Sequence, residues 1–258
     1  MDQDNCIRHE MAETAQGHIH TLWVNNPARL NILNSATMAA LCTTLEQIAS
    51  DPHARVTVLR GSGERAWIGG ADIREMANLD ANSAVAFIRR VHGVCHALRM
   101  LPTPVVAAIR GYCLGAGLEV AASCDLRLAA HGASFAMPEV RVGLPSVVEA
   151  SLLPGLVGAG RARDLVMTAR TVEADEALRW GLIDGLVAND QLDALVNERV
   201  EQLLAGAPAA MRTQKTLCRA WEEQPLSDAI ELSIEAFGKS FESDEPRTHL
   251  QQFLNRKR

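Results

Sequence analysis

Strand-like and helix-like segments alternate along the first part of this 258-residue chain. Residues 18–24 alternate polar and apolar side chains, residues 55–60 read RVTVLR, and residues 105–109 are entirely apolar. These patterns are typical of strands. Residues 35–50 and 82–100 instead place apolar side chains at helical spacing. Strands separated by helices pair mainly in parallel, so the chain is predicted to be an α/β protein built in layers.

Beyond Gly158 the pattern becomes helical. Helices are predicted over residues 161–168, 173–180, 190–204, 209–221, 226–241 and 246–254, and a further strand over 125–129 precedes them. A core of roughly 200 residues with an appendage fits the usual size of ~100–200 residues per domain. We therefore expect a core over residues 1–195 and a helical C-terminal region over residues 196–258.

Charge and composition argue against several classes of partner. The net charge is −6 with Lys and Arg scattered, which predicts no binding of nucleic acid. The longest apolar runs are far shorter than the ~20 residues that span a bilayer, so no membrane association is expected. The first residues are acidic and polar, unlike a secretory signal, and the six cysteines form no CxxC pair. The expectation is a cytoplasmic protein with reduced thiols and no zinc site.

Two glycine patterns fail the tests for nucleotide binding. A dinucleotide fingerprint would need a third glycine, where this chain has Val120 in one case and Arg163 in the other. The sequence contains no P-loop and no GxSxG elbow. Nicotinamide chemistry, P-loop ATP hydrolysis and serine-hydrolase chemistry therefore lose support.

In two other segments a predicted strand runs into a glycine-rich turn and then into the start of a helix. Residues 66–76 read AWIGGADIREM and residues 111–119 read GYCLGAGLE. Small residues there leave backbone N–H groups at a helix N-terminus, which attract negative charge. Two such groups aimed at one carbonyl would form an oxyanion hole, each donor contributing roughly 3–4 kcal/mol. The alternative is that these glycines serve only close packing.

Two carboxylates, Glu119 and Glu139, stand among small and apolar residues. A carboxylate in such surroundings is costly to desolvate unless it has a partner or a task. If both converge on one substrate, they suggest proton-transfer chemistry. The alternatives are a helix N-terminal carboxylate stabilised by the helix dipole for Glu119, and a loop residue paired with Arg141 for Glu139.

Other polar residues have simpler interpretations. Asp72 is suited to cap the short helix that follows it. Glu149 is compatible with a solvent-facing position. His92 and His96 lie one helical turn apart, but no third ligand accompanies them, so no metal site is expected.

The same segments, taken together, resemble the crotonase superfamily of enoyl-CoA hydratases and isomerases. The resemblance is carried in order by residues 26–33, 67–76, 111–125, 135–144 and 174–187, so it covers nearly the whole chain. It implies a spiral of ββα units with a C-terminal helical trimerisation region, assembled as a homotrimer or as a hexamer of two trimers. It also implies an acyl-CoA thioester substrate, as in fatty acid metabolism. No metal or redox cofactor is implied, because coenzyme A enters as part of the substrate.

The resemblance assigns roles to four residues. The backbone N–H groups of Ala71 and Ala116 would hold the thioester oxygen and stabilise the charge that develops there as an enolate forms. Glu119 and Glu139 would hold a water molecule between them. Glu139 is expected to deliver a proton to C2 and Glu119 to activate the water that attacks C3.

A further set of residues is expected to line the path of coenzyme A. By resemblance, these residues are Ala28, Leu30, Ile68, Gly69, Gly70, Asp72, Ile73, Arg74, Gly115 and Gly143. Arg74 stands where many members carry a lysine near the phosphates. The alternative for Arg74 is an exposed, solvated side chain.

One segment departs from the family pattern. Residues 145–153 read PSVVEASLL where many members have a glycine-rich stretch, and the segment is one residue shorter. Val147 and Val148 should narrow the space beside the acyl group, and Glu149 would add a third carboxylate nearby. The leading hypothesis is an enoyl-CoA hydratase that adds water to a 2-enoyl-CoA. The alternatives are an isomerase, which can work with one carboxylate, and a non-catalytic member that binds acyl-CoA or RNA.

Overall fold

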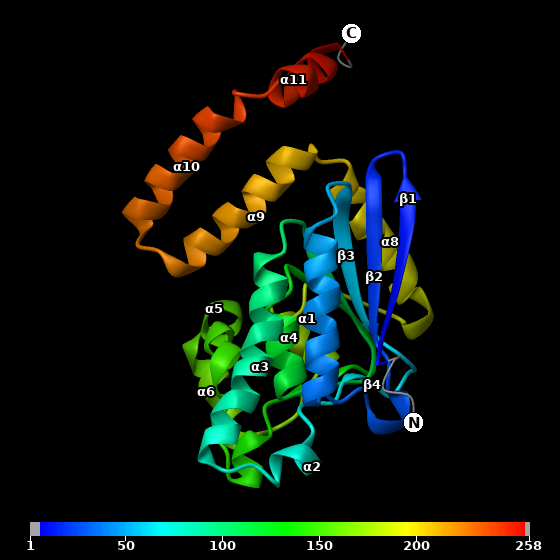
Figure 1. The fold of residues 1–258 in the computed structure, drawn as a ribbon, viewed down its shortest axis with the longest axis vertical. Helices are drawn as coiled ribbons and strands as arrows, with labels where there is room; N and C mark the ends of the chain where they lie inside the picture. Colours follow the sequence, from blue (N-terminus) through cyan, green and yellow to red (C-terminus); the bar gives the residue numbers. More distant parts are fainter. Residues whose placement is uncertain (1–5, 256–258) are drawn as a thin grey trace.

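The computed structural model describes residues 6–255 (Figure 1). The acidic first residues discussed above, 1–5, lie outside this range. Among the described residues, no helix is both long and apolar enough to cross a bilayer.

The strands form two sheets. The larger sheet has the order β1-β2-β3-β5-β7-β10, and all its pairs are parallel except β1 with β2. Its strands are β1 (Ile7–Thr14), β2 (Gly17–Val24), β3 (Ala54–Gly61), β5 (Val105–Ile109), β7 (Leu126–Ala130) and β10 (Gly185–Val187). The smaller sheet has the order β4-β6-β8-β9, with only β9 antiparallel. Its strands are β4 (Ala66–Ile68), β6 (Tyr112–Leu114), β8 (Ser134–Ala136) and β9 (Val172–Glu173).

The chain visits the two sheets in turn, one strand in each, and then enters a helix. β3 and β4 lead to α2 (Ile73–Met76) and α3 (Ala81–Met100), and β5 and β6 lead to α4 (Ala116–Ala122). β7 and β8 lead to the 3-10 helix η3 (Glu139–Val142). This confirms the predicted α/β spiral of ββα units. Because each unit ends at the same side of the smaller sheet, the starts of α2, α4 and η3 come together there.

Two long helices cover the larger sheet. α1 (Ser35–Ala49) begins where the Asn34 side chain accepts a hydrogen bond from the Thr37 amide, and it buries Met38, Leu41, Leu45 and Ile48. α3 begins with a reciprocal capping box between Asp80 and Ser83. The two helices pack side by side (Figure 1). Both were predicted from their apolar periodicity.

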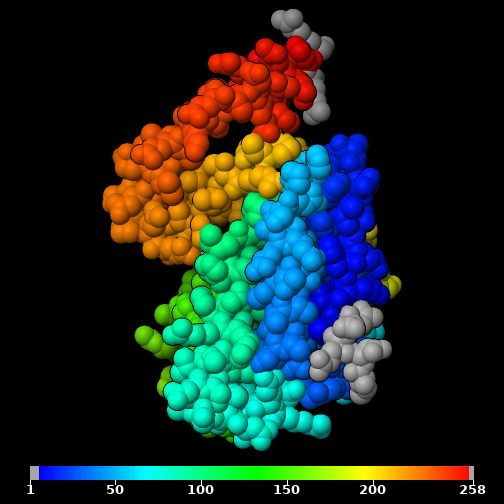
Figure 2. Space-filling model, viewed as in Figure 1, coloured from blue at the N-terminus to red at the C-terminus, as the bar shows by residue number. Residues whose placement is uncertain are grey.

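The remaining helices complete the chain. η4 (Val148–Leu152), α5 (Leu153–Val157), α6 (Ala159–Thr168) and α7 (Ala174–Trp180) lie between β8 and β10, and η2 (Pro27–Arg29) and η5 (Asn189–Gln191) are single 3-10 turns. α8 (Leu192–Leu204) packs on the larger sheet through Leu192, Val196 and Val200. α9 (Pro208–Glu223), α10 (Leu226–Ser240) and α11 (Glu245–Asn255) follow. α10 and α11 form an arm that projects from the body (Figure 2).

The structure places residue 195 within α8, which belongs to the packed body. α9 is fastened to that body as well. The buried Lys215 ammonium donates to the carbonyls of Leu98 and Thr103 and pairs with Asp125 at 2.8 Å. The division at residue 195 stays a prediction.

Candidate active site

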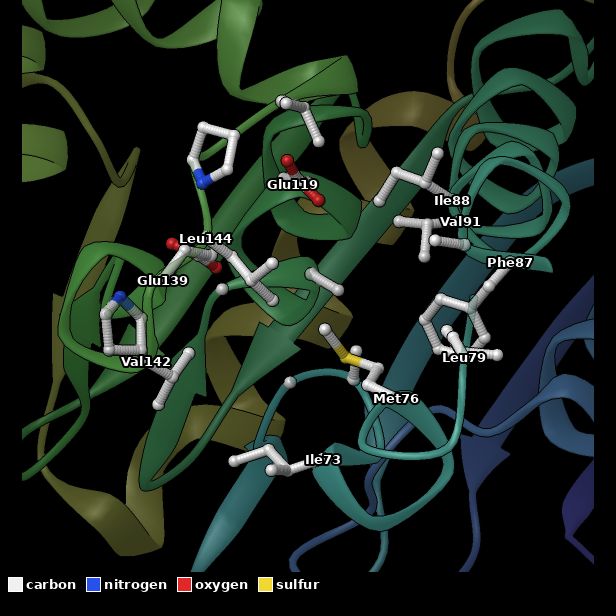
Figure 3. A pocket seen from close by; sticks show the side chains of 18 of the residues that line it. Ile73, Met76, Leu79, Phe87, Ile88, Val91, Glu119, Glu139, Val142 and Leu144 are labelled. Atoms are coloured by element: carbon white, nitrogen blue, oxygen red, sulfur yellow. The ribbon is translucent and has the colours of Figure 1, made fainter. Parts of the chain in front are cut away.

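A cavity of about 680 Å³ opens where the starts of α2, α4 and η3 meet (Figure 3). Its walls come from the turn after β4, from α2 and α3, from the start of α4, and from η3 with the loop that follows. Figure 3 shows Glu119 and Glu139 on one side of it, facing apolar side chains from α2 and α3. The apolar wall consists of Ile73, Met76, Leu79, Ala84, Val85, Phe87, Ile88 and Val91. The cavity can therefore hold a mainly apolar group against two acid side chains.

Backbone hydrogen bonds connect the turn after β4 to the loop between β2 and α1. The amide of Gly69 donates to Leu30, the amide of Leu33 donates to Gly70, and the amide of Asp72 donates to Leu33, at 2.8–2.9 Å. Gly70 has φ +107°, a conformation that residues with side chains rarely adopt. This turn brings Gly69, Gly70 and Ala71 to the cavity wall.

The second glycine-rich turn leads into α4 and leaves no room for side chains. A Cβ on Gly117 would clash with the carbonyl of Ile68, and a Cβ on Gly115 would clash with Oε1 of Glu139. Gly115 also has φ +51°. These glycines do pack closely, as one interpretation of the sequence held, and the close packing is what brings the two turns and Glu139 together.

Ala71 and Ala116 carry the two backbone amides that were predicted to form an oxyanion hole. Both residues line the cavity. Ala116 is the first residue of α4, where an amide has no partner within its own helix. Among residues 6–255 neither amide donates to a backbone or side-chain acceptor. Two unsatisfied donors at one cavity are available to an incoming carbonyl oxygen.

Glu119 lies in the first turn of α4 and is only 4% exposed. Burial, followed by the negative charge of Glu139, raises its pKa to about 8, and the charge of Glu149 adds to this. Within the described part of the chain, the one contribution that lowers this pKa is a hydrogen bond from the Ala150 amide to Oε1 at 3.3 Å. Glu119 is therefore mainly protonated at neutral pH.

Glu139 begins η3 and is partly buried. Its Oε2 accepts a hydrogen bond from the Ser146 hydroxyl at 2.8 Å. An ion pair with Arg141, the alternative considered from the sequence, is absent among the described residues. Ser146 was not identified from the sequence, because its role depends on how the loop after η3 folds back.

The residues expected along the coenzyme A path separate into two groups. Gly69, Gly70, Ile73 and Gly115 line the cavity. The others do not line it: Ala28, Leu30, Ile68, Asp72, Arg74 and Gly143. Leu30 adjoins the cavity wall through its hydrogen bond with Gly69, and Ile68 is fully buried beneath it. These assignments stay predictions.

Asp72 and Arg74 differ in how far their side chains are engaged. The Asp72 carboxylate caps α2 by accepting from the Arg74 amide and pairs with Arg29 at 3.0 Å, which confirms its predicted capping role. The Arg74 side chain is exposed, and among the described residues it has no ion-pair partner. Arg74 is thus free to meet an anion, whereas Asp72 is committed to local structure.

The apolar wall from α3 was only partly anticipated. The helical spacing of apolar residues in 82–100 predicts that Val85, Ile88 and Val91 face inward, toward a core. In the structure Val91 is buried, but Val85 is 52% exposed and borders the cavity. Periodicity identifies an apolar face without revealing whether protein or ligand covers it.

One group of described residues has the spacing of metal ligands, namely His18, His20 and Asp51. Both imidazoles approach the same oxygen, Asp51 Oδ2, at 2.7 and 2.9 Å. A hydrogen-bonded network accounts for this arrangement without an ion. None of the three residues lines the cavity.

Comparisons with known proteins agree with this geometry. Residues 14–258 match the family model described as enoyl-CoA hydratase/isomerase. The chain is 32% identical to a short-chain-enoyl-CoA hydratase of Clostridium acetobutylicum, covering 94% of each protein. It is also 32% identical to a crotonyl-CoA hydratase of Syntrophomonas wolfei, covering 92% of each. The crystal structure of an enoyl-CoA hydratase from Bacillus anthracis superposes with a TM-score of 0.91 at 28% identity, covering 98% of this chain and 97% of that one.

Proposed function

Because this chain belongs to the enoyl-CoA hydratase/isomerase family, we propose that it adds water across the double bond of a 2-enoyl-CoA thioester. The observation that carries the proposal is the position of two carboxyl groups on one side of an apolar cavity whose wall also contains two unsatisfied amides. Hydration needs both features, since charge develops on the thioester oxygen while protons move at C2 and C3. The two hydratase relatives support the same reaction.

The reaction would begin with the thioester oxygen at the amides of Ala71 and Ala116. These donors are already in place, so they stabilise the enolate without reorganising when its charge develops. The acyl chain would lie against the apolar wall from α2 and α3. The 680 Å³ cavity is within the usual range of ~300–1,000 Å³ for small-molecule sites.

Glu119 and Glu139 would act as a pair that holds one proton. The raised pKa of Glu119 places this proton on Glu119 before the reaction. A water bound between the two groups lets the proton pass to Glu139, after which Glu119 can accept a proton from the water that attacks C3. Glu139 then delivers its proton to C2. This keeps the division of roles predicted from the sequence and requires a coupled pair.

The structure also suggests how coenzyme A is held. Leu30, Gly69 and Gly70 bring two loops together beside the cavity, and their backbone groups can accompany an extended pantetheine chain. The exposed guanidinium of Arg74 offers a partner for phosphate. In this proposal coenzyme A enters as part of the acyl-CoA substrate, and the protein needs no cofactor of its own.

Assembly through the C-terminal arm forms part of the same proposal. Leu226, Ile234, Phe237, Phe253 and Leu254 on α10 and α11 are all more than half exposed. Exposed apolar side chains gathered on one element are typical of a surface covered by another chain. Size-exclusion chromatography with light scattering should give the mass of three or six copies of the chain. The mass of a monomer would contradict assembly through the arm.

The proposal is tested by assaying the purified protein with crotonyl-CoA and longer 2-enoyl-CoA substrates. Hydration is followed as loss of the absorbance of the conjugated thioester. Glu139→Gln keeps the size of the side chain but removes its acid–base function, so the rate should fall at least ~100-fold. Glu13→Gln, at an exposed position of β1, serves as the matched control. A wild-type protein that hydrates none of these substrates would overturn the proposal.

A further inference from the structure

Glu149 is a third carboxylate near the cavity, and it is buried although it does not line the cavity. It lies in η4 and is 7% exposed. Its Oε1 is 2.7 Å from Nδ1 of His92 on α3. Its Oε2 is also buried, and none of residues 6–255 provides a hydrogen-bond partner for that oxygen. A buried carboxylate oxygen without a donor is costly and calls for an explanation.

The backbone beside Glu149 is held in an unfavourable conformation. Val148 has φ +42°, in the left-handed region that β-branched residues avoid. Such outliers persist where the surrounding structure requires them, often near functional sites. Here the same short segment places Glu149 against α3 and directs the amide of Ala150 to Oε1 of Glu119. The segment thus links both carboxylates.

The charged and titratable groups around this segment come from three elements. α3 contributes His92, with His96 one turn further on, and the buried Cys95. α4 contributes Glu119, and η3 contributes Glu139 and Arg141 at the cavity wall. α5, which follows η4, has the sequence LPGLV and carries no titratable side chain.

We propose that Glu149, held by His92, is a positioning residue that acts on Glu119 from behind the cavity and raises the pH at which Glu119 releases its proton. This rests on the proposed role of Glu119 in hydration. The charge of Glu149 lies in a poorly solvated region, where its effect on a neighbouring carboxyl is weakly screened. The negative charge of Glu149 disfavours ionisation of Glu119. The pair of Glu119 and Glu139 therefore keeps its single proton into mildly basic solution. His92, at the surface end, connects Glu149 to solvent.

Glu149→Gln tests the proposal because it removes the charge and keeps the shape. Infrared spectroscopy of the full-length protein across a pH series follows the protonated carboxyl band of Glu119, identified by its loss in Glu119→Gln. The midpoint of this band should fall in Glu149→Gln, because a like charge that disfavours ionisation of Glu119 has been removed. The basic limb of kcat/KM for hydration should move by the same amount. Glu13→Gln should leave both unchanged.

His92→Lys provides a variant that is safe for folding, because residue 92 is a half-exposed position on a helix. A permanent positive charge beside Glu149 should also lower the midpoint of the Glu119 band. An unchanged midpoint in folded Glu149→Gln or His92→Lys overturns the proposal, since a purely structural role would alter stability without moving this midpoint. If the midpoint falls but the wild type hydrates no enoyl-CoA, the proposed function fails while the action of Glu149 on Glu119 stands.

Discussion

The pKa values of two carboxylates in this molecule, Glu119 and Asp51, are shifted in opposite directions. Burial and the charge of Glu139 raise the pKa of Glu119 to about 8. Burial would also raise the pKa of Asp51, but hydrogen bonds from the His18 ring, the His53 amide and the His20 ring lower it to about 2. Asp51 has three donors, whereas Glu119 has one long bond from an amide and two acidic neighbours. The donors around a carboxylate decide its state, so the cavity keeps an acid and the histidine cluster keeps an anion.

The largest test of this contrast compares the same change at both positions. Glu119→Gln should reduce the rate of hydration at least ~100-fold, because an amide cannot exchange a proton with the bound water. Asp51→Asn should change the rate less than about twofold, because Asp51 does not border the cavity. Steady-state assays with crotonyl-CoA measure both. If both variants lost hydration activity equally, the functional separation of the cavity carboxylates from the histidine cluster around Asp51 would be contradicted.

The pH dependence of the reaction sharpens the contrast further. The pair of Glu119 and Glu139 must hold one proton, and the pKa of Glu119 is about 8 in the free protein. The value of kcat/KM, which reports the free enzyme, should therefore fall as the pH rises above about 8. Initial rates measured at a series of pH values on both sides of pH 8 give this fall in kcat/KM. A profile that stays flat well into basic solution would show that this proton is not required.

Stability should depend on pH through Glu119 with the sign of a raised carboxyl pKa. The folded value of about 8 exceeds the ordinary 4.5, so the stabilisation is complete below 4.5 and is lost as the pH rises to about 8. Glu119→Gln removes this loss. The variant should gain thermal stability relative to the wild type as the pH increases, measured by melting at mildly acidic and mildly basic pH. If the melting temperature of the variant minus that of the wild type fell as the pH rises, the burial of a neutral acid would be contradicted.

Asp51 should show the smallest effect and the opposite sign. Its folded pKa of about 2 lies below the ordinary 3.8, so its contribution is present above 3.8 and is lost as the pH falls to about 2. Asp51→Asn should lower the melting temperature by a few degrees at neutral pH, at about 2–4 °C per kcal/mol for a chain of this size. The difference should shrink in acid. A constant difference across pH would mean that packing, rather than charge, explains it.

The sequence predicted the parts of the fold that depend on local pattern. β2, β3, β5, α1 and α3 follow from alternation or periodicity, and the two turns that form the cavity were identified from their small residues. β1 was missed because its sequence, IRHEMAET, is mostly polar, and only its pairing with β2 makes it a strand. The short strands β8 and β9 of the smaller sheet were missed for a similar reason, since neighbouring strands define them.

The site was predictable where chemistry and local structure coincide. Glu119 at the start of a helix and Glu139 after a proline could be singled out from the chain alone. The burial of Glu149 could not be, because it depends on a contact with His92 from another element. The apolar wall was visible as one face of α3, but a helix facing a ligand and a helix facing a core have the same periodicity.

Gly115 has a consequence for how this chain can change over time. The volume that a methyl group would occupy at that position is already filled by the carboxyl group of Glu139. A mutation at either position therefore alters what the other can accept, even though two strands and a helix separate them in the sequence. Gly115 is therefore constrained twice, because a lineage that replaced Glu139 with a smaller residue would still face the φ of +51°, which strains any side chain at position 115.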